Sequence, residues 1–300
     1  MEPVEKFVVG THGRLHFLDW GGDGPLAHLL HANGFCAGTY SPFVAALGPA
    51  LHLTASDIRG HGDSAFIETD RIVHWKVFAE DLKDIVEGVM TPPVIGMGHS
   101  LGAVTAYIAA AAYPHLFSAL VLMDPVVLPR HLLWMIRILK ALGLAGAIPL
   151  ARGARRRRRS FRDRKEALAR FAAGRGIFKS WEPAFIDAYL ECGLLEKDDA
   201  TAVLKCDPET EARIFESVPL DVWTYAKGIR CPVLMVRGEF SEAFRPGQAD
   251  RLARRITDCR LETIAGAGHF IPMEKPGELA ALILDFLADC RVCRQTGDGG

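Results

Sequence analysis

The sequence predicts an α/β fold with a mainly parallel sheet of eight strands and an inserted helical cap. Short runs rich in aliphatic residues recur along the chain, and several are apolar throughout, as is typical of strands buried on both faces of a parallel sheet. Helical patterns separate these runs. The alternation is interrupted once, between Met123 and Pro232, where helical patterns occur without a convincing strand. This interruption predicts the inserted cap.

The expected strands are the runs at 7–9, 15–18, 27–31, 51–55, 93–97, 119–123, 232–236 and 260–264. The first two runs are joined by Gly10-Thr11-His12-Gly13, which suits a hairpin and predicts an antiparallel start. Helices are expected at roughly Trp75–Met90, Leu101–Tyr113, Pro246–Ile256 and Pro276–Ala288. The expected divisions are a first core part (1–124), the cap (125–228), a second core part (229–290) and a flexible tail (291–300).

Length and composition allow one large hydrophobic core, because the chain has 300 residues and is 49% hydrophobic. The formal net charge of -1 gives no overall attraction to nucleic acid or anionic lipid. Glu2 and Glu5 stand where a signal peptide would have basic residues, so a cytoplasmic protein is expected. The apolar stretch 132–150 contains Arg137 and Lys140, which argues against a membrane span and favours a buried or interfacial helix.

The seven cysteines are odd in number and scattered, so reduced thiols are expected rather than a disulfide framework. Cys290 and Cys293 form a lone C-x-x-C pair without a second pair or a nearby strand-to-helix turn. We interpret that pair as incidental, so neither a metal nor a cofactor is expected.

A candidate nucleophile follows the strand run at 93–97. The residues Gly98-His99-Ser100-Leu101-Gly102 form G-x-S-x-G between an apolar strand and a helix rich in small residues. This context predicts a sharp turn that exposes the Ser100 hydroxyl, with glycines where side chains would collide with the neighbouring backbone. The Leu101 N–H, at the start of the helix, is then expected to donate to a developing oxyanion.

Further motifs occur in a characteristic order around this turn, and they are HANGF, DIRGHGDS, GHSLG, RGEFSE and GAGHFIPMEKP. With them the sequence resembles the α/β-hydrolase superfamily over nearly the whole chain. The resemblance implies that Ser100 is the nucleophile and His269 the general base. It also implies a second oxyanion donor in the Phe35 N–H, with the Asn33 side chain as an alternative, and a structural role for His31.

The third member of the triad is less clear from the sequence. Most relatives have an Asp just after the seventh strand, where this chain has Ser241. Glu242 is the preferred acid because it follows by one residue and matches relatives with a shifted acid. Asp124, after the sixth strand, matches the position used by another part of the superfamily, and Glu239 is a weaker alternative.

The cap is expected to choose the substrate, and its apolar residues favour an acyl chain or a hydrophobic ring. The candidate substrate-binding residues in addition to Asn33 are Trp134, Leu139, Phe178 and Trp181. The basic run Arg155–Arg159 has two interpretations. It is either a solvated face offset by acidic residues or a peripheral contact with an anionic membrane, whereas nucleic-acid binding is not expected.

The expected activity is hydrolysis of carboxylic esters that have a hydrophobic acyl or alcohol part, through an acyl-enzyme on Ser100. A C–C bond hydrolase or an acyltransferase using the same triad stays open. So does a binding protein of the same fold without catalysis. The sequence does not indicate an oligomeric state.

Overall fold

A computed structural model describes residues 2–65 and 72–290. Its main sheet has eight strands. In spatial order these are β1 (Val4–Gly10), β2 (Gly13–Gly21), β4 (His52–Ser56), β3 (Leu26–Leu30), β5 (Val94–His99), β6 (Phe117–Met123), β10 (Val233–Gly238) and β11 (Cys259–Ile264). All eight strands coincide with the aliphatic runs, so the predicted fold class is confirmed.

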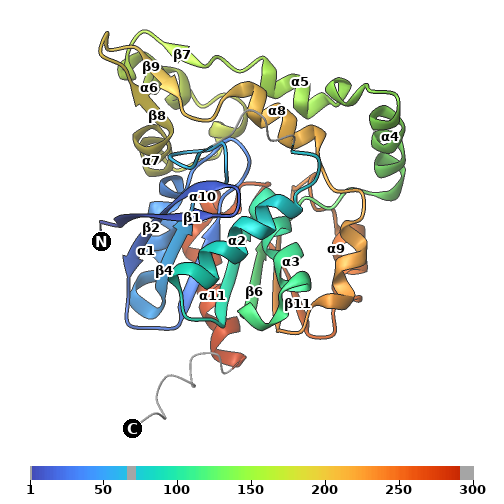
Figure 1. Cartoon of the computed structure of the whole chain (residues 1–300). Helices are drawn as coiled ribbons and strands as arrows, with labels where there is room; N and C mark the ends of the chain where they lie inside the picture. The colour runs from blue at the N-terminus through green and yellow to red at the C-terminus, as the bar shows by residue number, and fades with distance from the viewer. Residues whose placement is uncertain (1, 66–71, 291–300) are drawn as a thin grey trace.

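Strand directions follow the prediction as well. β1 pairs with β2 in an antiparallel hairpin closed by Gly10 and Gly13, and β2 pairs with β4 in the antiparallel direction. From β4 to β11 every neighbouring pair is parallel. The carboxyl ends of β5, β6, β10 and β11 therefore meet at one edge of the sheet, where the polar loops that follow them come together (Figure 1).

Helices cover both faces of this sheet, and each face has its own hydrophobic core. One core contains residues of α1 (Ser41–Leu47) and α11 (Pro276–Asp289). The other contains residues of α2 (Lys76–Val89), α3 (Leu101–Ala112), η6 (Val222–Gly228) and α9 (Pro246–Ala253). The shorter helices are η1 (Ala37–Tyr40), η2 (Gly48–Ala50), η3 (Pro114–Leu116) and α10 (Ile271–Glu274). Alternate residues of β5 and β6 contribute to opposite cores, so the strands are buried on both sides, as their apolar composition predicts.

The inserted segment between β6 and η6 lies beyond the carboxyl edge of the sheet (Figure 1). Its elements are α4 (Arg130–Ala141), η4 (Ala145–Ala147), α5 (Pro149–Arg155), β7 (Ser160–Phe161), α6 (Arg164–Ala172), η5 (Gly176–Lys179), α7 (Pro183–Gly193), β8 (Leu194–Glu196), β9 (Ala202–Leu204) and α8 (Pro208–Glu216). The expectation of a strand-free insertion is wrong, because β7, β9 and β8 form a small antiparallel sheet. These strands are only two or three residues long, too short to show an alternating pattern in the sequence.

The divisions placed at 124/125 and 228/229 stay predictions, and the tail 291–300, with Cys293, lies outside the described residues. Within the described residues, none of the helices has the length and apolar character needed to cross a membrane. The apolar stretch 132–150 is divided among α4, η4 and α5.

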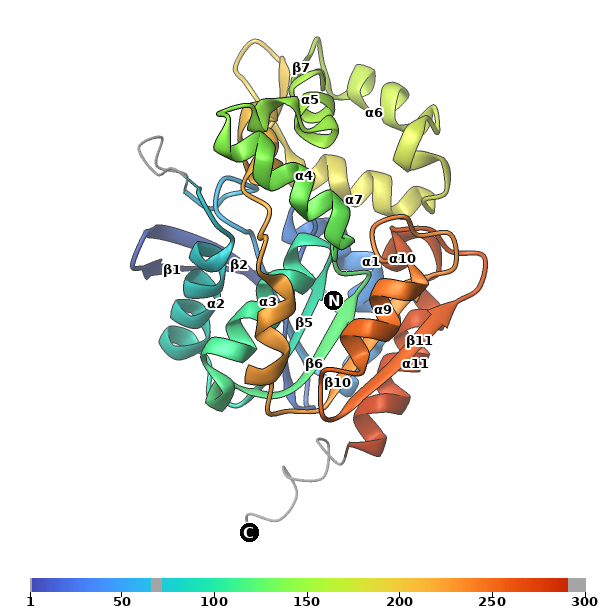
Figure 2. The ribbon, with the colours of Figure 1, turned by 90° about the vertical axis from the view of Figure 1, so that its right-hand side faces the viewer.

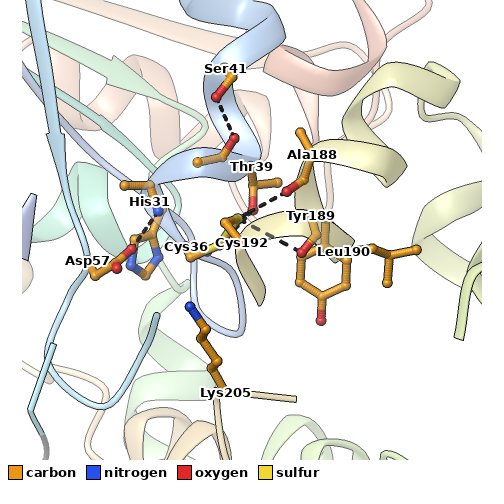
Figure 3. Close-up of a disulfide and its surroundings, with 12 residues drawn as sticks. His31, Cys36, Thr39, Ser41, Asp57, Ala188, Tyr189, Leu190, Cys192 and Lys205 are labelled. Atoms are coloured by element: carbon orange, nitrogen blue, oxygen red, sulfur yellow. Dashed lines mark hydrogen bonds between the residues drawn. A yellow bond between two sulfur atoms is a disulfide. The ribbon is translucent and has the colours of Figure 1, made fainter. Parts of the chain in front are cut away.

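One disulfide corrects the expectation that all cysteines are reduced. Cys36 and Cys192 are bonded to each other and are 156 residues apart in the sequence (Figure 3). Cys36 directly precedes η1 in the core, and Cys192 lies in α7 of the inserted segment. The packing there is close, since a Cβ on Gly38 would lie 2.8 Å from the Cβ of Cys192. A pair 156 residues apart has no local spacing motif from which the sequence could predict it.

Candidate active site

Ser100 lies in the turn between β5 and α3, with φ 56° and ψ −113°. This left-handed conformation is rare for a residue with a side chain. Both flanking glycines are required by close packing. A Cβ on Gly98 would lie 2.3 Å from the Gly102 carbonyl oxygen, and one on Gly102 would lie 2.2 Å from that of Leu30. The strained turn predicted from the pentapeptide is therefore present.

His269 follows β11 and contacts the Ser100 hydroxyl. The distance from its Nε2 to Ser100 Oγ is 3.0 Å, and the distance from its Nδ1 to Asp124 Oδ1 is 2.9 Å. Ser100, His269 and Asp124 thus form a continuous line of hydrogen bonds. These three residues follow β5, β11 and β6, so the carboxyl edge of the sheet brings them together.

Asp124 is fully buried, and the neighbouring β10 turn fixes its carboxylate. Oδ2 accepts the Gly238 N–H at 2.8 Å, while Oδ1 accepts a short hydrogen bond from Ser241 Oγ in addition to the contact with His269. Both carboxylate oxygens therefore accept hydrogen bonds that hold the group in one orientation.

The preference for Glu242 as the partner of His269 is corrected by this geometry. The Glu242 side chain is 78% exposed and pairs with Arg245, three residues further along the chain. Glu239 also points elsewhere, because its Oε2 accepts the Gly266 N–H at 2.8 Å. The β10 turn directs Ser241 inward, so the next residue along the chain faces solvent.

His99, which sequence reasoning left without a role, connects two loops of the site. Its Nε2 donates to the His269 carbonyl at 2.8 Å, and its Nδ1 accepts from the Tyr40 hydroxyl at 2.7 Å. Burial, reinforced by the neighbouring His269, holds the pKa of His99 well below its ordinary value, so the ring is neutral. Tyr40 in turn accepts the Ala32 N–H at 3.0 Å. A chain of hydrogen bonds thus connects the loop after β3 to the loop with His269.

The expected oxyanion donors lie in the loop after β3 and at the start of α3. The Phe35 N–H donates to the Ala32 carbonyl at 3.3 Å, and Leu101, as the first residue of α3, has no intrahelical partner for its N–H. The amide of Asn33 donates to the Glu211 carbonyl of α8 at 3.0 Å, so Asn33 joins this loop to the inserted segment. His31 fixes the loop, because its Nδ1 donates to the Ala32 carbonyl and its Nε2 accepts the Ile58 N–H.

Aromatic rings from the core and the inserted segment pack beside His269. Phe35 contacts Trp181 with ring centroids 5.2 Å apart and Phe270 at 5.9 Å. Phe270 itself lies 5.0 Å from the His269 ring. Phe178 packs on Trp181 at 4.9 Å. Of the predicted lining residues, Phe178 and Trp181 therefore belong to this aromatic cluster. Phe270 belongs to it as well, and the sequence signal for it is its position directly after His269.

The other two predicted lining residues lie on α4. Trp134 is 67% exposed and lines a surface cleft together with Arg251 and Arg255, so its assignment to the substrate pocket stays a prediction. It faces outward because Leu133 and Ile136 occupy the buried side of the helix. Leu139 is partly buried and packs against the core that contains α2 and α3.

One group of side chains has the composition of a metal site. The candidate ligand atoms of His16, Asp57 and Asp63 lie within 4.8 Å of one another. Asp57 Oδ2 already contacts His16 Nδ1 at 2.7 Å and accepts the Asp63 N–H at 2.9 Å. These contacts explain the cluster as packing of the turn after β4.

Fold and site together define an α/β hydrolase with a serine at the turn after β5. A family model described as "Alpha/beta hydrolase family" matches residues 29–282, so the chain belongs to this family.

The relatives found by sequence carry names that describe different activities. The chain is 37% identical over 122 residues to the esterase Rv0045c of Mycobacterium tuberculosis, a match that covers 40% of each chain. It is 34% identical over 97 residues to protein phosphatase methylesterase 1 of Mus musculus, covering 31% of this chain and 25% of that one. It is 26% identical over 268 residues to 2-(acetamidomethylene)succinate hydrolase of Mesorhizobium japonicum, covering 89% of each.

Solved structures agree on the fold. A crystal structure of E-2-(acetamidomethylene)succinate hydrolase matches with a TM-score of 0.76 and 23% identity, covering 95% of this chain and 99% of that chain. A structure of the Mycobacterium tuberculosis esterase Rv0045c matches with a TM-score of 0.72 and 24% identity, covering 96% of this chain and 93% of that chain. The chain thus has the fold of its family, the α/β hydrolases, and its relatives include proteins named as esterases.

Proposed function

We propose that this protein hydrolyses carboxylic esters through an acyl-enzyme on Ser100. The single observation that carries the proposal is the line of hydrogen bonds from Ser100 Oγ through His269 to Asp124. An alcohol is a poor nucleophile near neutral pH, and it needs a base in contact with it and a fixed orientation of that base. His269 is the base in contact with Ser100, and Asp124 fixes the orientation of His269.

In the proposed first step, Ser100 Oγ attacks the ester carbonyl carbon while His269 Nε2 takes the hydroxyl proton. The buried Asp124 carboxylate stabilises the imidazolium that forms, a role that the exposed Glu242 cannot fill. His269 then gives the proton to the leaving alkoxide, and the alcohol departs. In the second step His269 removes a proton from water, which attacks the acyl-enzyme, and then gives that proton to Ser100 Oγ as the acid leaves.

The negative charge on the carbonyl oxygen needs donors in both steps. The Leu101 N–H at the start of α3 is the first proposed donor, because helix N-termini favour negative charge. The Phe35 N–H is the second. Its present hydrogen bond to Ala32 is 3.3 Å long, near the upper limit for such a bond, and is therefore weak enough to be exchanged for an oxyanion.

Aromatic packing beside the site supports an ester with a hydrophobic acyl or alcohol part. Phe35, Trp181 and Phe270 lie together next to His269, with the inserted segment acting as the cap. Such a surface binds an alkyl chain or a ring better than a polar group. The names of the esterase and the methylesterase among the relatives agree with an ester substrate.

The test combines a fluorophosphonate probe with p-nitrophenyl esters of increasing acyl length. The probe should label the wild type and not Ser100→Ala, and kcat should fall roughly 10⁶-fold in that variant. Ser118→Ala, a serine of β6 outside the site, should keep wild-type labelling and turnover. Labelling without turnover of any ester would contradict ester hydrolysis and favour the C–C hydrolase or acyltransferase. Absence of labelling would favour a binding protein.

A further inference from the structure

Helix α4 has a strongly apolar outer side. Trp134, Ile138 and Leu142 follow one another at intervals of four residues and are 67%, 44% and 66% exposed. Met135 beside them is 45% exposed. In Figure 2 this helix crosses the front of the molecule, on the outside of the inserted segment.

The apolar surface continues beyond the helix. Leu144 and Leu150 are 52% and 58% exposed where the chain turns from α4 through η4 into α5. We call the whole surface the α4 face, and it consists of Trp134, Met135, Ile138, Leu142, Leu144 and Leu150. Several large apolar side chains on one surface mark an interaction site rather than ordinary scatter.

A cleft of about 450 Å³ adjoins the α4 face. Four arginines line it. Arg130 and Arg137 belong to α4, Arg251 belongs to α9, and Arg255 follows α9. Figure 2 shows α4 and α9 on the same side of the molecule. We call this the arginine cleft. Trp134 lines it too, so the cleft and the α4 face share a residue.

The positive charge of the arginine cleft is largely uncompensated. Asp221 is the one acidic residue among the residues that line it, and its carboxylate already contacts His74 at 2.8 Å and Tyr225 at 2.9 Å. Among the described residues, neither Arg130 nor Arg137 forms an ion pair with a carboxylate. Such guanidinium groups favour an anionic group from outside the chain.

The basic run Arg155–Arg159 differs in this respect. Four of its five arginines form ion pairs with carboxylates of the chain, and these are Arg155 with Glu209 and Glu216, Arg157 with Glu211, Arg158 with Glu166 and Arg159 with Asp207. The inserted segment therefore offsets this run internally. Arg130 and Arg137 of α4 have no such carboxylate partner among the described residues.

We propose that the protein docks on an anionic lipid surface through the α4 face, with the arginine cleft against the phosphate groups. Apolar side chains beside basic ones are the pattern of interfacial helices. Trp134 lies at the boundary between the two, the position that tryptophan favours at a membrane surface. A second copy of the chain fits less well, because a symmetric contact through this surface would bring arginines against arginines. The proposal does not depend on the activity proposed for Ser100.

The experiment is co-sedimentation with vesicles of phosphatidylglycerol and phosphatidylcholine, compared with phosphatidylcholine alone. The wild type should bind only the anionic vesicles, and less so as salt is raised. Arg130→Gln with Arg137→Gln should lower the partition coefficient on the order of thirtyfold, about fivefold for each charge. Trp134→Ser with Leu142→Ser should also lose binding, although the charge is unchanged.

The matched control is Arg158→Gln with Arg159→Gln, which removes the same charge from paired positions and should leave binding unchanged. Circular dichroism and melting temperature check that every variant is folded. Failure of the wild type to bind anionic vesicles at low salt overturns the proposal. So does an equal loss in the control pair, which would mean that only overall charge matters. Sedimentation velocity that shows a dimer dissolved by Trp134→Ser would assign the face to a second copy instead.

Discussion

The Nδ1 atom of His269 lies 2.9 Å from Oδ1 of Asp124, and the same carboxylate accepts a hydrogen bond from Ser241. Ser241 occupies the position where many relatives have an acid. In this chain the carboxylate that contacts His269 follows β6 instead, and Ser241 in the loop after β10 donates to it. The carboxylate of Asp124 thus follows β6, and the hydroxyl of Ser241 that holds it follows β10.

This arrangement predicts different outcomes for two neutralised carboxylates. Asp124→Asn should lower kcat by roughly 10⁴-fold, the scale seen when a triad acid is neutralised. Glu242→Gln should have kcat close to the wild type, because the Glu242 side chain is 78% exposed and pairs with Arg245. Steady-state kinetics on one p-nitrophenyl ester measures both. A crippled Glu242→Gln with an active Asp124→Asn would mean that His269 changes partner during turnover.

A pair of buried tyrosines tests the hydrogen-bond chain behind the site. Tyr40→Phe leaves the Ala32 N–H and His99 Nδ1 without their partner, so the free energy of unfolding should fall by about 1–3 kcal/mol. Tyr107 is buried as well, but among the described residues its hydroxyl has no hydrogen-bond partner. Tyr107→Phe should therefore be neutral or stabilising. Urea denaturation compares the two, and equal losses would contradict the chain.

The disulfide predicts a third difference. Because Cys36 and Cys192 close a loop of 156 residues, Cys192→Ser should lower the free energy of unfolding by about 2–5 kcal/mol. Cys259→Ser, at a free cysteine, should change it little. Urea denaturation with and without reductant gives the measurement. Reduction should bring the wild type to the stability of Cys192→Ser, and a wild type insensitive to reductant would contradict a stabilising bond.

The sequence predicted what neighbouring residues encode. The eight strands appear as aliphatic runs, and Ser100 and His269 stand in motifs that are contiguous in the chain. What it did not predict depends on contacts between distant segments. The choice of Asp124 depends on where the β10 turn points Ser241, and the outward position of Trp134 depends on which side of α4 meets the core.

Buried histidines give the stability of the protein a pH dependence. His28 in β3 is 1% exposed, and its two ring nitrogens contact the hydroxyls of Thr54 and Ser56 at 2.8 and 2.9 Å. Burial lowers the pKa of His28 from its ordinary value of 6.5 to about 3. Between these two values the unfolded chain binds a proton that the folded chain does not. The stability contribution is therefore complete above pH 6.5 and is lost as the pH falls toward 3.

His28→Gln tests this, because glutamine keeps a polar side chain there and does not titrate. In that variant the fall of the unfolding free energy with decreasing pH should be shallower by up to about 1.4 kcal/mol per pH unit, the effect of one proton. Urea denaturation at a series of pH values between about 7 and 5 measures the slope. His115→Gln serves as control, since the side chain of His115 is 67% exposed. A slope in His28→Gln equal to that of the wild type would mean that the folded protein also binds the proton at position 28, and burial at β3 would then not determine its charge.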